Sequence, residues 1–371
     1  MITKNAVIGR FVSYIQEKDV YIYGLGEVYR RLTERDVYPC IHARVAGFLD
    51  SGKAGQTLEV MDKSYPIHDI GLLKQVTRGV VLICSTKCMR EMYEALGEAN
   101  LSDGMECFFL PFIWAVSDGR DDEALKKQMQ IADPAKDQIE KKINCFWFSG
   151  EEKPAQYQKC IDSWKRVCPD YEIIEWNADT YDCEKNLFVK QAFEKRKWAF
   201  VSDYARLDVI YHNGGIYLDM DVELLQTFDP LLQFRAFFNF STQFYIDLGS
   251  GFGSVKGNPF LGRLLELYED IAFVDENGEP MTWKYMQPAF LRDSFQRAGV
   301  RMNGDMQLVD GMLMLPRRYY TPMDDFLLKN YLQCEDTRGV HMYNAGWCSN
   351  DFHAQRDEYL PWLKMDETLE S

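Results

Sequence analysis

Short apolar runs alternate along the chain with segments whose apolar positions recur every three or four residues, which predicts strands interleaved with helices. In the first third of the chain, helices are expected up to Arg35 and near residues 89–96. The strands expected there are residues 19–23 (DVYIY), 45–49, 79–84 (GVVLIC) and 107–110. Such an alternation is typical of a parallel sheet covered on both faces, so this part is expected to be an α/β domain.

A charge-dense segment at residues 118–142 predicts a solvated helix and a linker. The alternation of strands and helices returns after it. Beyond it, the expected elements are a strand at 143–148, a helix from Pro154 to about Val167, a strand at 171–176 and one or two helices over 186–212. This order predicts a second parallel sheet with a ligand crevice at the carboxyl ends of its strands. We therefore expect two domains, 1–135 and 140–371.

Residues 197–229 (KWAFVSDYARLDVIYHNGGIYLDMDVELLQTFD) predict a helix, a break and a strand that ends on acids. The helix is expected over Ala199–His212, and Asn213-Gly214-Gly215 ends it, because glycine adopts the left-handed conformation without strain. In the strand that follows, alternation places Tyr217, Asp219 and Asp221 on one face.

Two carboxylates one residue apart at the end of a strand supply hard oxygen ligands, which predicts a Mg²⁺ or Mn²⁺ site at Asp219 and Asp221. One turn apart on the preceding helix, Asp203 and Arg206 share a face. Charges at this spacing usually form a surface pair. Here their neighbours are apolar, which favours a buried pair that binds a phosphate-bearing ligand.

Two more residues are expected at the same sheet edge, because Trp147 and Asn177 fall near the ends of their own strands. Trp147 has two equally supported roles, stacking on a nucleobase or packing in the core.

Composition excludes some partners. The 371 residues carry a formal charge of −15 and 46% hydrophobic residues, and the pI is about 4.9. This balance argues against nucleic acid or an anionic membrane surface as a non-specific partner. An anionic nucleotide remains compatible, because a divalent cation reverses the local field. Nothing in the composition predicts the oligomeric state.

The expected location is the cytoplasm, including the inner face of the membrane if the acceptor is lipid-linked. No run of about 18 apolar residues predicts a membrane span. The first residues (MITKNAVIGRFVSYIQEKD) lack the apolar core of a signal peptide. The ten cysteines are scattered without a C-x-x-C pair, which is typical of reduced thiols.

Gly24-Leu25-Gly26 follows the first predicted strand and resembles the opening of a Rossmann-type unit. The fingerprint is incomplete, because Tyr29 stands where the third glycine belongs. One interpretation is a nucleotide or dinucleotide pocket with Asp50 as the ribose-binding acid. The other, which the partial fingerprint favours, is a degenerate module that has only a structural role.

Four segments together resemble glycosyltransferase family thirty-two, the DXD-containing sugar transferases of bacterial capsule clusters, over residues 141–350. They are CFWFSG, CIDSWKRVCPDYEIIEWN, FVSDYARLDVIYHNGGIYLDMDVELLQTFD and HMYNAGW. The resemblance implies a GT-A fold and a UDP- or GDP-hexose donor. It also implies Asp221 as the direct metal ligand, Asp219 between ribose and metal, and Asp203 and Arg206 on the sugar hydroxyls and diphosphate.

The resemblance further implies that Trp147 stacks on the base and that the late His341 and Trp347 close over the diphosphate. His341 would either complete the metal shell or be a structural histidine. Two departures stand close by: His341-Met342 and Ala345-Gly346 replace a frequent His-His and Gly-Ser. The acceptor side stays unassigned.

The leading hypothesis is a metal-dependent, retaining transferase with Asp219, Asp221 and Arg206 as its catalytic residues. It would move a hexose from a nucleotide sugar to a glycan or lipid-linked acceptor in capsular or surface polysaccharide synthesis, without an enzyme base. A glycosidase pair fits less well, since its acids face each other across a sugar. The alternatives are a non-catalytic sugar-nucleotide binding or regulatory protein, and an NAD-dependent dehydrogenase or epimerase acting through Gly24 and Gly26.

Overall fold

The computed structural model describes residues 2–131, 138–324, 329–343 and 367–368. The chain divides into unit 1, which holds Met1–Ser117 and the late strand β17 (Glu367–Thr368), and unit 2, which runs from Asp118 to Cys348. The division precedes the expected 135–140 boundary because the segment around helix α6 (Glu123–Met129) is tied to unit 2. In this segment Lys126 pairs with Asp336 at 2.5 Å, and Asp118 pairs with Arg318 at 2.6 Å.

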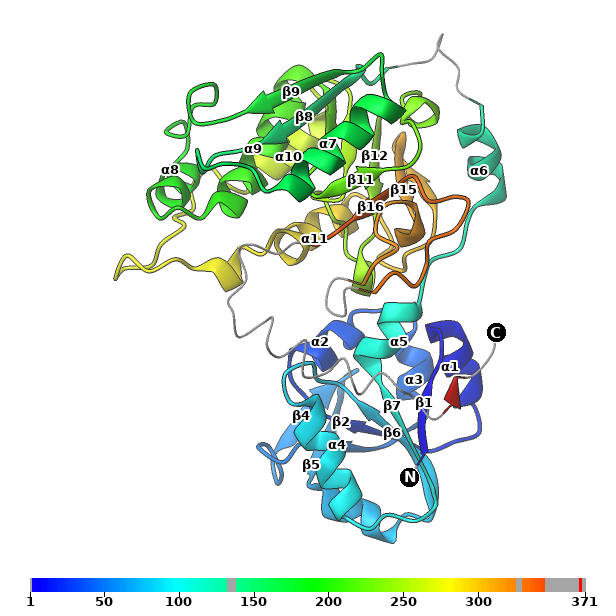
Figure 1. Cartoon of the computed structure of the whole chain (residues 1–371). Coiled ribbons are helices and arrows are strands. Elements are labelled where there is room, and N and C mark those ends of the chain that lie inside the picture. Colours follow the sequence, from blue (N-terminus) through cyan, green and yellow to red (C-terminus); the bar gives the residue numbers. More distant parts are fainter. Residues whose placement is uncertain (1, 132–137, 325–328, 344–366, 369–371) are drawn as a thin grey trace. The chain divides into compact units, whose positions relative to one another are not determined.

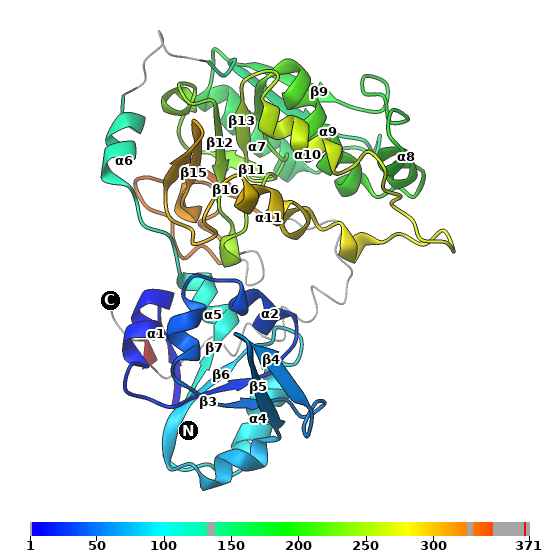
Figure 2. The ribbon, with the colours of Figure 1, turned by 180° about the vertical axis from the view of Figure 1, so that it is seen from behind.

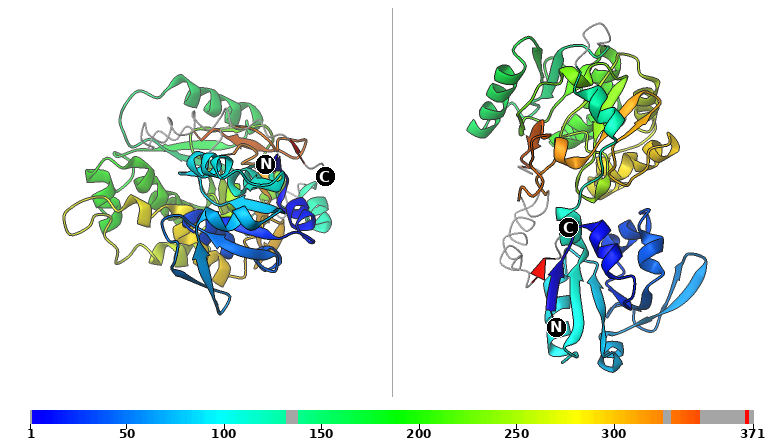
Figure 3. Two further views of the ribbon diagram at one scale, coloured as in Figure 1. Left: turned by 90° about the horizontal axis from the view of Figure 1, so that it is seen from below. Right: turned by 90° about the vertical axis from the view of Figure 1, so that its right-hand side faces the viewer.

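Unit 1 is built on an eight-stranded sheet in the order β17-β1-β7-β6-β2-β3-β5-β4. Every neighbouring pair is parallel except β4 with β5, which confirms the expected α/β class. The pairing of β17 with β1 is visible in Figure 3. The other strands are β1 (Ile2–Asn5), β2 (Val20–Tyr23), β3 (Val45–Leu49), β4 (Thr57–Val60), β5 (Lys63–His68), β6 (Arg78–Ile83) and β7 (Gly104–Phe109).

Continuous apolar runs form the central strands of this sheet because both of its faces are covered. All four residues of β2 and five of the six in β6 are buried. The helices of unit 1 are α1 (Ile8–Tyr14), α2 (Glu27–Thr33), α3 (Tyr38–His42), α4 (Met89–Glu98) and α5 (Leu110–Val116), with the 3₁₀ segment η1 at Ile70–Gln75. The sequence did not predict β1, the β4–β5 hairpin, α1, α3 or α5.

Unit 2 contains a seven-stranded sheet in the order β14-β15-β12-β13-β10-β8-β9. Its strands are β8 (Lys142–Phe146), β9 (Glu172–Trp176), β10 (Gly215–Tyr217), β12 (Ala236–Asn239), β13 (Phe252–Ser254), β14 (Gln307–Val309) and β15 (Met312–Leu315). As expected, β9, β8 and β10 are parallel neighbours. The whole sheet is mixed, because β13 runs antiparallel to both β10 and β12, and β14 runs antiparallel to β15.

Helices cover both faces of this sheet (Figures 1 and 2). Adjacent residues of β12 show the two layers: Phe237 stacks on Phe228 in the core beneath α7, whereas Phe238 meets Phe260 of α10 and Phe295 of α11 edge to face. The helices of unit 2 besides α6 are α7 (Ala155–Val167), α8 (Leu187–Glu194), α9 (Trp198–Asn213), α10 (Pro259–Glu266) and α11 (Gln287–Arg297). The short 3₁₀ segments are η3 (Asp229–Leu231), η4 (Thr242–Phe244), η5 (Thr282–Lys284) and η6 (Arg317–Tyr319).

A separate two-stranded ribbon joins segments far apart in the sequence. Strand β11 (Val222–Leu224) pairs antiparallel with β16 (Gly339–His341), and Val222 lies opposite His341. The indole N–H of Trp164 in α7 donates to the Val222 carbonyl at 2.7 Å and fixes the ribbon to the core. Among the described residues, no helix is long and apolar enough to cross a membrane.

Candidate metal centre

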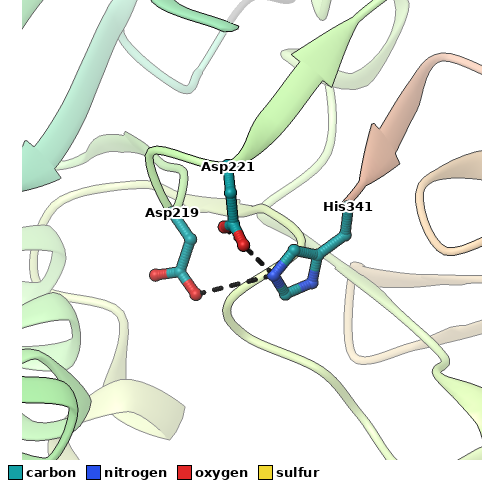
Figure 4. A group of neighbouring side chains, drawn as sticks. All are labelled: Asp219, Asp221 and His341. Carbon is teal, nitrogen blue, oxygen red and sulfur yellow. Dashed lines mark ion pairs between the residues drawn. The ribbon is translucent and has the colours of Figure 1, made fainter. Parts of the chain in front are cut away.

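Three potential metal ligands, Asp219, Asp221 and His341, converge in unit 2 (Figure 4). Their ligand atoms all lie within 4.8 Å of one another. His341 Nε2 is 3.3 Å from Asp221 Oδ1 and 3.9 Å from Asp219 Oδ2. The structure thus brings the predicted acid pair close to His341. The sequence had left two roles open for this histidine, a metal ligand or a structural residue.

Local backbone structure explains why the acids meet the histidine. Helix α9 ends where predicted, with Gly214 at φ 71° and Gly215 at φ 94°. The strand β10 then stops at Tyr217, so both acids lie in the turn that leads into β11 rather than within a strand. The ribbon partner carries His341, and the Met342 amide donates to the Asp221 carbonyl at 2.9 Å.

Asp247 is the residue of this site that sequence reasoning missed. Its Oδ2 lies 3.2 Å from Nδ1 of His341, and its Oδ1 accepts from the amides of Gly249 at 2.8 Å and Ser250 at 3.3 Å. A carboxylate on one ring nitrogen of a histidine fixes the tautomer and directs the other nitrogen toward a metal. The available signal was an acid directly before the glycine-rich segment LGSGFGSV at residues 248–255.

An arginine side chain from helix α9 lies beside the acids. Arg206 is 6% exposed, and its Nη2 lies 3.1 Å from Asp203 Oδ1 and 3.6 Å from Asp219 Oδ1. The guanidinium also sits 4.7 Å from the centre of the Tyr217 ring, whose hydroxyl donates to Asp219. The predicted burial of the Asp203–Arg206 pair is therefore observed, and the pair adjoins the acid turn.

The site is electrostatically crowded. Burial raises the pKa of Asp203 to about 7; Arg206 opposes this rise, and the Asp219 and Asp247 charges add to it. Burial lowers the pKa of His341, but Asp221 and Asp247 outweigh burial and hold that pKa well above its ordinary value. Burial also acts to raise the pKa of Asp247, yet the bond to His341 leaves it below the ordinary value.

The residues present fit a divalent cation. Two carboxylates and one oriented imidazole form an open set that leaves coordination positions for water and phosphate oxygens. Carboxylate ligands suit Mg²⁺ and Mn²⁺ alike.

The remaining predicted residues have local partners. Trp147 is half-buried after β8; its indole N–H donates to the Glu151 carbonyl at 2.7 Å, and its ring meets Tyr157 edge to face. The Asn177 side-chain oxygen accepts from the amides of Asp179 at 2.9 Å and Thr180 at 3.2 Å, which closes a turn after β9. Trp347 lies outside the described residues.

Part of unit 2 is similar to a family of known proteins. Residues 154–238 match the family model described as "Glycosyltransferase sugar-binding region containing DXD motif". The match includes α7, α9 and the Asp219–Asp221 turn, and it agrees with the expected GT-A-like α/β fold. A match to a solved structure titled "PaToxG Glycosyltransferase" covers 47% of this chain and 77% of the chain in that structure, with 17% sequence identity and a TM-score of 0.34.

Curated relatives come from two yeasts. Mannosyl phosphorylinositol ceramide synthase SUR1 of Saccharomyces cerevisiae is 28% identical over 159 residues, which are 41% of this chain and 40% of that protein. Inositol phosphoceramide mannosyltransferase 3 of Schizosaccharomyces pombe is 32% identical over 142 residues, 36% of this chain and 38% of that protein. The chain thus spans less than half the length of these relatives. These similarities support the expectation of a glycosyltransferase. Both relatives are fungal, and their names refer to mannosyl groups and not to capsular polysaccharide.

Proposed function

We propose that this chain is a metal-dependent glycosyltransferase that moves a hexose from a nucleoside-diphosphate sugar to a lipid-linked or glycan acceptor. The observation that carries the proposal is the convergence of Asp219, Asp221 and His341 within 4.8 Å, inside or beside the region that matches the DXD family model. The neighbouring guanidinium of Arg206 extends this site toward a phosphate-bearing ligand.

The protein's own groups would position and stabilise the leaving diphosphate. A divalent cation bound there supplies electrostatic stabilisation of the negative charge that builds on the diphosphate as the glycosidic bond breaks. Asp219, Asp221 and Nε2 of His341 would hold that cation, with Asp247 as a positioning residue behind the imidazole. Arg206 is pre-oriented by Asp203 and the Tyr217 ring, so its charge needs no rearrangement to meet a phosphate oxygen.

Asp203 would bind hydroxyl groups of the donor sugar. Its carboxylate already contacts Arg206, and the Gln287 side chain donates to the Asp203 carbonyl at 2.6 Å, which anchors this turn of α9. A sugar-binding acid beside a phosphate-binding cation would suit an intact sugar diphosphate.

Retention of anomeric configuration is the expected outcome. The bond between the anomeric carbon and the phosphate oxygen breaks, and the acceptor oxygen bonds to the same face of that carbon. The acceptor proton passes to an oxygen of the departing diphosphate, so no enzyme nucleophile or base is assigned. The relatives' names favour mannose as the first hexose to test and an inositol phospholipid as the first acceptor, ahead of the capsular acceptor expected from the sequence. An acceptor of that kind would place the reaction at a membrane surface.

The test is release of nucleoside diphosphate by the purified full chain from a panel of UDP- and GDP-hexoses, with Mn²⁺, Mg²⁺ or EDTA. We expect turnover with at least one donor, its loss in EDTA, and loss of about 10²–10³-fold in Asp221→Asn. Asp208→Asn is the matched control, because Asp208 is a buried acid that pairs with Lys185 at 2.6 Å outside the metal centre.

Full metal-dependent turnover in Asp221→Asn would refute the proposed site. Tight donor binding without release or transfer across a broad acceptor panel would instead support a non-catalytic sugar-nucleotide binding protein. The departures beside His341 in the sequence favour that second function.

A further inference from the structure

Unit 1 contains a cavity of about 470 Å³ that shares no residue with the metal centre of unit 2. It lies at the carboxyl ends of β2 and β6, which are labelled in Figure 1, and of β3, which is labelled in Figure 2. Residues from the loops after these three strands line it, among them Gly24, Gly26, Asp50, Ser85 and Thr86. Its size lies within the range of small-molecule sites in proteins.

The topology explains why a cavity forms at this point of the sheet. The chain proceeds from β2 to β3 on one side of β2, and later returns to place β6 on the other side. The loops after β2 and β6 therefore lead away in opposite directions. In open parallel sheets, the crevice outside such a reversal is where ligands bind.

Packing accounts for one of the two glycines in the β2 loop but not for the other. Gly24 has φ +91°, and a Cβ there would meet Cε of Met92 at 2.8 Å. Gly26 has φ −93°, which any residue adopts, and a Cβ there would meet nothing within 4 Å. The missing side chain at Gly26 keeps the backbone open toward the cavity, as a phosphate group that approaches the main chain requires.

Asp50 stands at the end of β3 with its carboxylate pre-oriented. Oδ2 accepts from the Leu25 amide at 2.9 Å, and Oδ1 accepts from the Gly52 amide at 3.0 Å. Each oxygen keeps a second lone pair, and the residue is only half-buried at the cavity wall. An acid in this position relative to a glycine turn is suited to bind the hydroxyl groups of a ribose.

The cavity also limits the size of its ligand. Tyr29, where a dinucleotide fingerprint has its third glycine, is 4% exposed, and its hydroxyl hydrogen-bonds that of Tyr38 at 2.7 Å. The third glycine allows close helix–strand packing in dinucleotide sites, and here a buried ring fills that space. A single nucleotide, with Tyr23 and Met92 as apolar walls for its base, suits the cavity better than a dinucleotide.

We propose that unit 1 binds a 5′-ribonucleotide in this cavity, with its ribose on Asp50 and its phosphate over the Gly24–Gly26 turn. The site is independent of the proposed transferase function and replaces the purely structural role that the partial fingerprint favoured.

Cys88 provides a local probe, because its thiol is exposed and the residue lines the cavity. Cys40 is also exposed in unit 1 but does not line the cavity, so it is the internal control. The full chain is treated with iodoacetamide in EDTA, which disables the metal-dependent site. AMP, GMP, UMP and CMP are added separately, and modification of each cysteine is followed by peptide mass spectrometry.

At about ten times its Kd, one of the four nucleotides should slow Cys88 modification roughly tenfold and leave Cys40 unchanged. Gly26→Ala, which has room for its methyl group, should keep the thermal transition of the wild type and lose the protection. The 2′-deoxy form of the same nucleotide should protect less, a comparison that needs no variant. Absence of protection by all four nucleotides, or equal protection in a folded Gly26→Ala, would overturn the proposal whatever the transferase assay shows.

Discussion

Replacement of Asp247 by Asn tests whether the metal centre depends on the carboxylate behind His341. Asn preserves the size of the side chain, and its single oxygen can still accept from the Gly249 and Ser250 amides. What faces Nδ1 of His341 at 3.2 Å is then an amide N–H₂ group instead of a carboxylate oxygen. The imidazole is left without the anionic partner that holds a proton on Nδ1 and directs Nε2 toward the metal.

The expected loss in metal affinity follows from the histidine's orientation. Variants that remove such an outer carboxylate lose about 10–100-fold in metal affinity. At about 1.4 kcal/mol per tenfold change, this is about 1.4–2.8 kcal/mol of binding free energy. Asp219 and Asp221 remain in place, so binding should be weakened rather than abolished, and the loss in Asp221→Asn should be larger.

The assay is calorimetric titration of the metal-free protein with MnCl₂ at fixed pH, with Asp208→Asn as the matched control. Asp208 is 4% exposed and Asp247 is 8% exposed, and both accept bonds from other side chains, so both variants lose one buried charge. Only Asp247→Asn should raise the Kd for Mn²⁺. If the Kd of Asp247→Asn for Mn²⁺ stays within about twofold of the wild-type value, Asp247 does not orient His341 for a metal. The proposal that His341 is a metal ligand would then also be contradicted.

Three further outcomes follow from the same geometry. Burial raises the pKa of Asp203 from 3.8 to about 7, so ionisation of Asp203 opposes folding, and the free energy of unfolding should fall by up to roughly 4 kcal/mol between pH 4 and 7. Asp203→Asn should remove this fall, as measured by thermal denaturation, and should abolish donor turnover. In Gly249→Ala the new Cβ would lie 2.4 Å from Asp219 Oδ2, so the affinity for Mn²⁺ should fall with little loss of stability. In the control Gly97→Ala, a Cβ meets nothing within 4 Å, so calorimetric titration with MnCl₂ should show unchanged metal binding. Below the raised pKa of His341 the metal must displace a proton, so the apparent affinity for Mn²⁺ should increase by up to about tenfold per pH unit, and a pH-independent Kd would contradict this.

Local patterns in the sequence predicted local structure well. Strand β3 lies at the predicted residues, and α9 ends at the predicted glycines. Apolar periodicity and glycine conformations are set by neighbours in the chain, so they can be read without knowledge of the fold. The acid pair and the Asp203–Arg206 pair were found in this way because one continuous segment contains all four residues.

Long-range pairing was not predictable from such patterns. Both strands of the β11–β16 ribbon have only three residues, and more than a hundred residues separate them, so nothing local in either strand identifies its partner. The same holds for Asp247, whose role depends on contact with His341 94 residues away. The antiparallel strand β13 was not among the strands expected from the sequence.

The charges of the candidate metal centre favour a bound cation. Among the described residues, four carboxylates, a guanidinium and an imidazole meet in one largely buried region: Asp203, Asp219, Asp221, Asp247, Arg206 and His341. Four carboxylates thus share two cationic partners, and like charges at this range cannot all stay ionised in a poorly solvated site. Burial raises the pKa of Asp203 to about 7, and the charges of Asp221 and Asp247 raise the pKa of His341, so protons on these two groups would relieve the repulsion. A divalent cation would replace the proton on His341 and neutralise the acid turn, which leaves Arg206 free to attract the donor diphosphate. Metal binding should therefore precede or accompany donor binding, because without the cation the diphosphate would meet the uncompensated charge of Asp219 and Asp221.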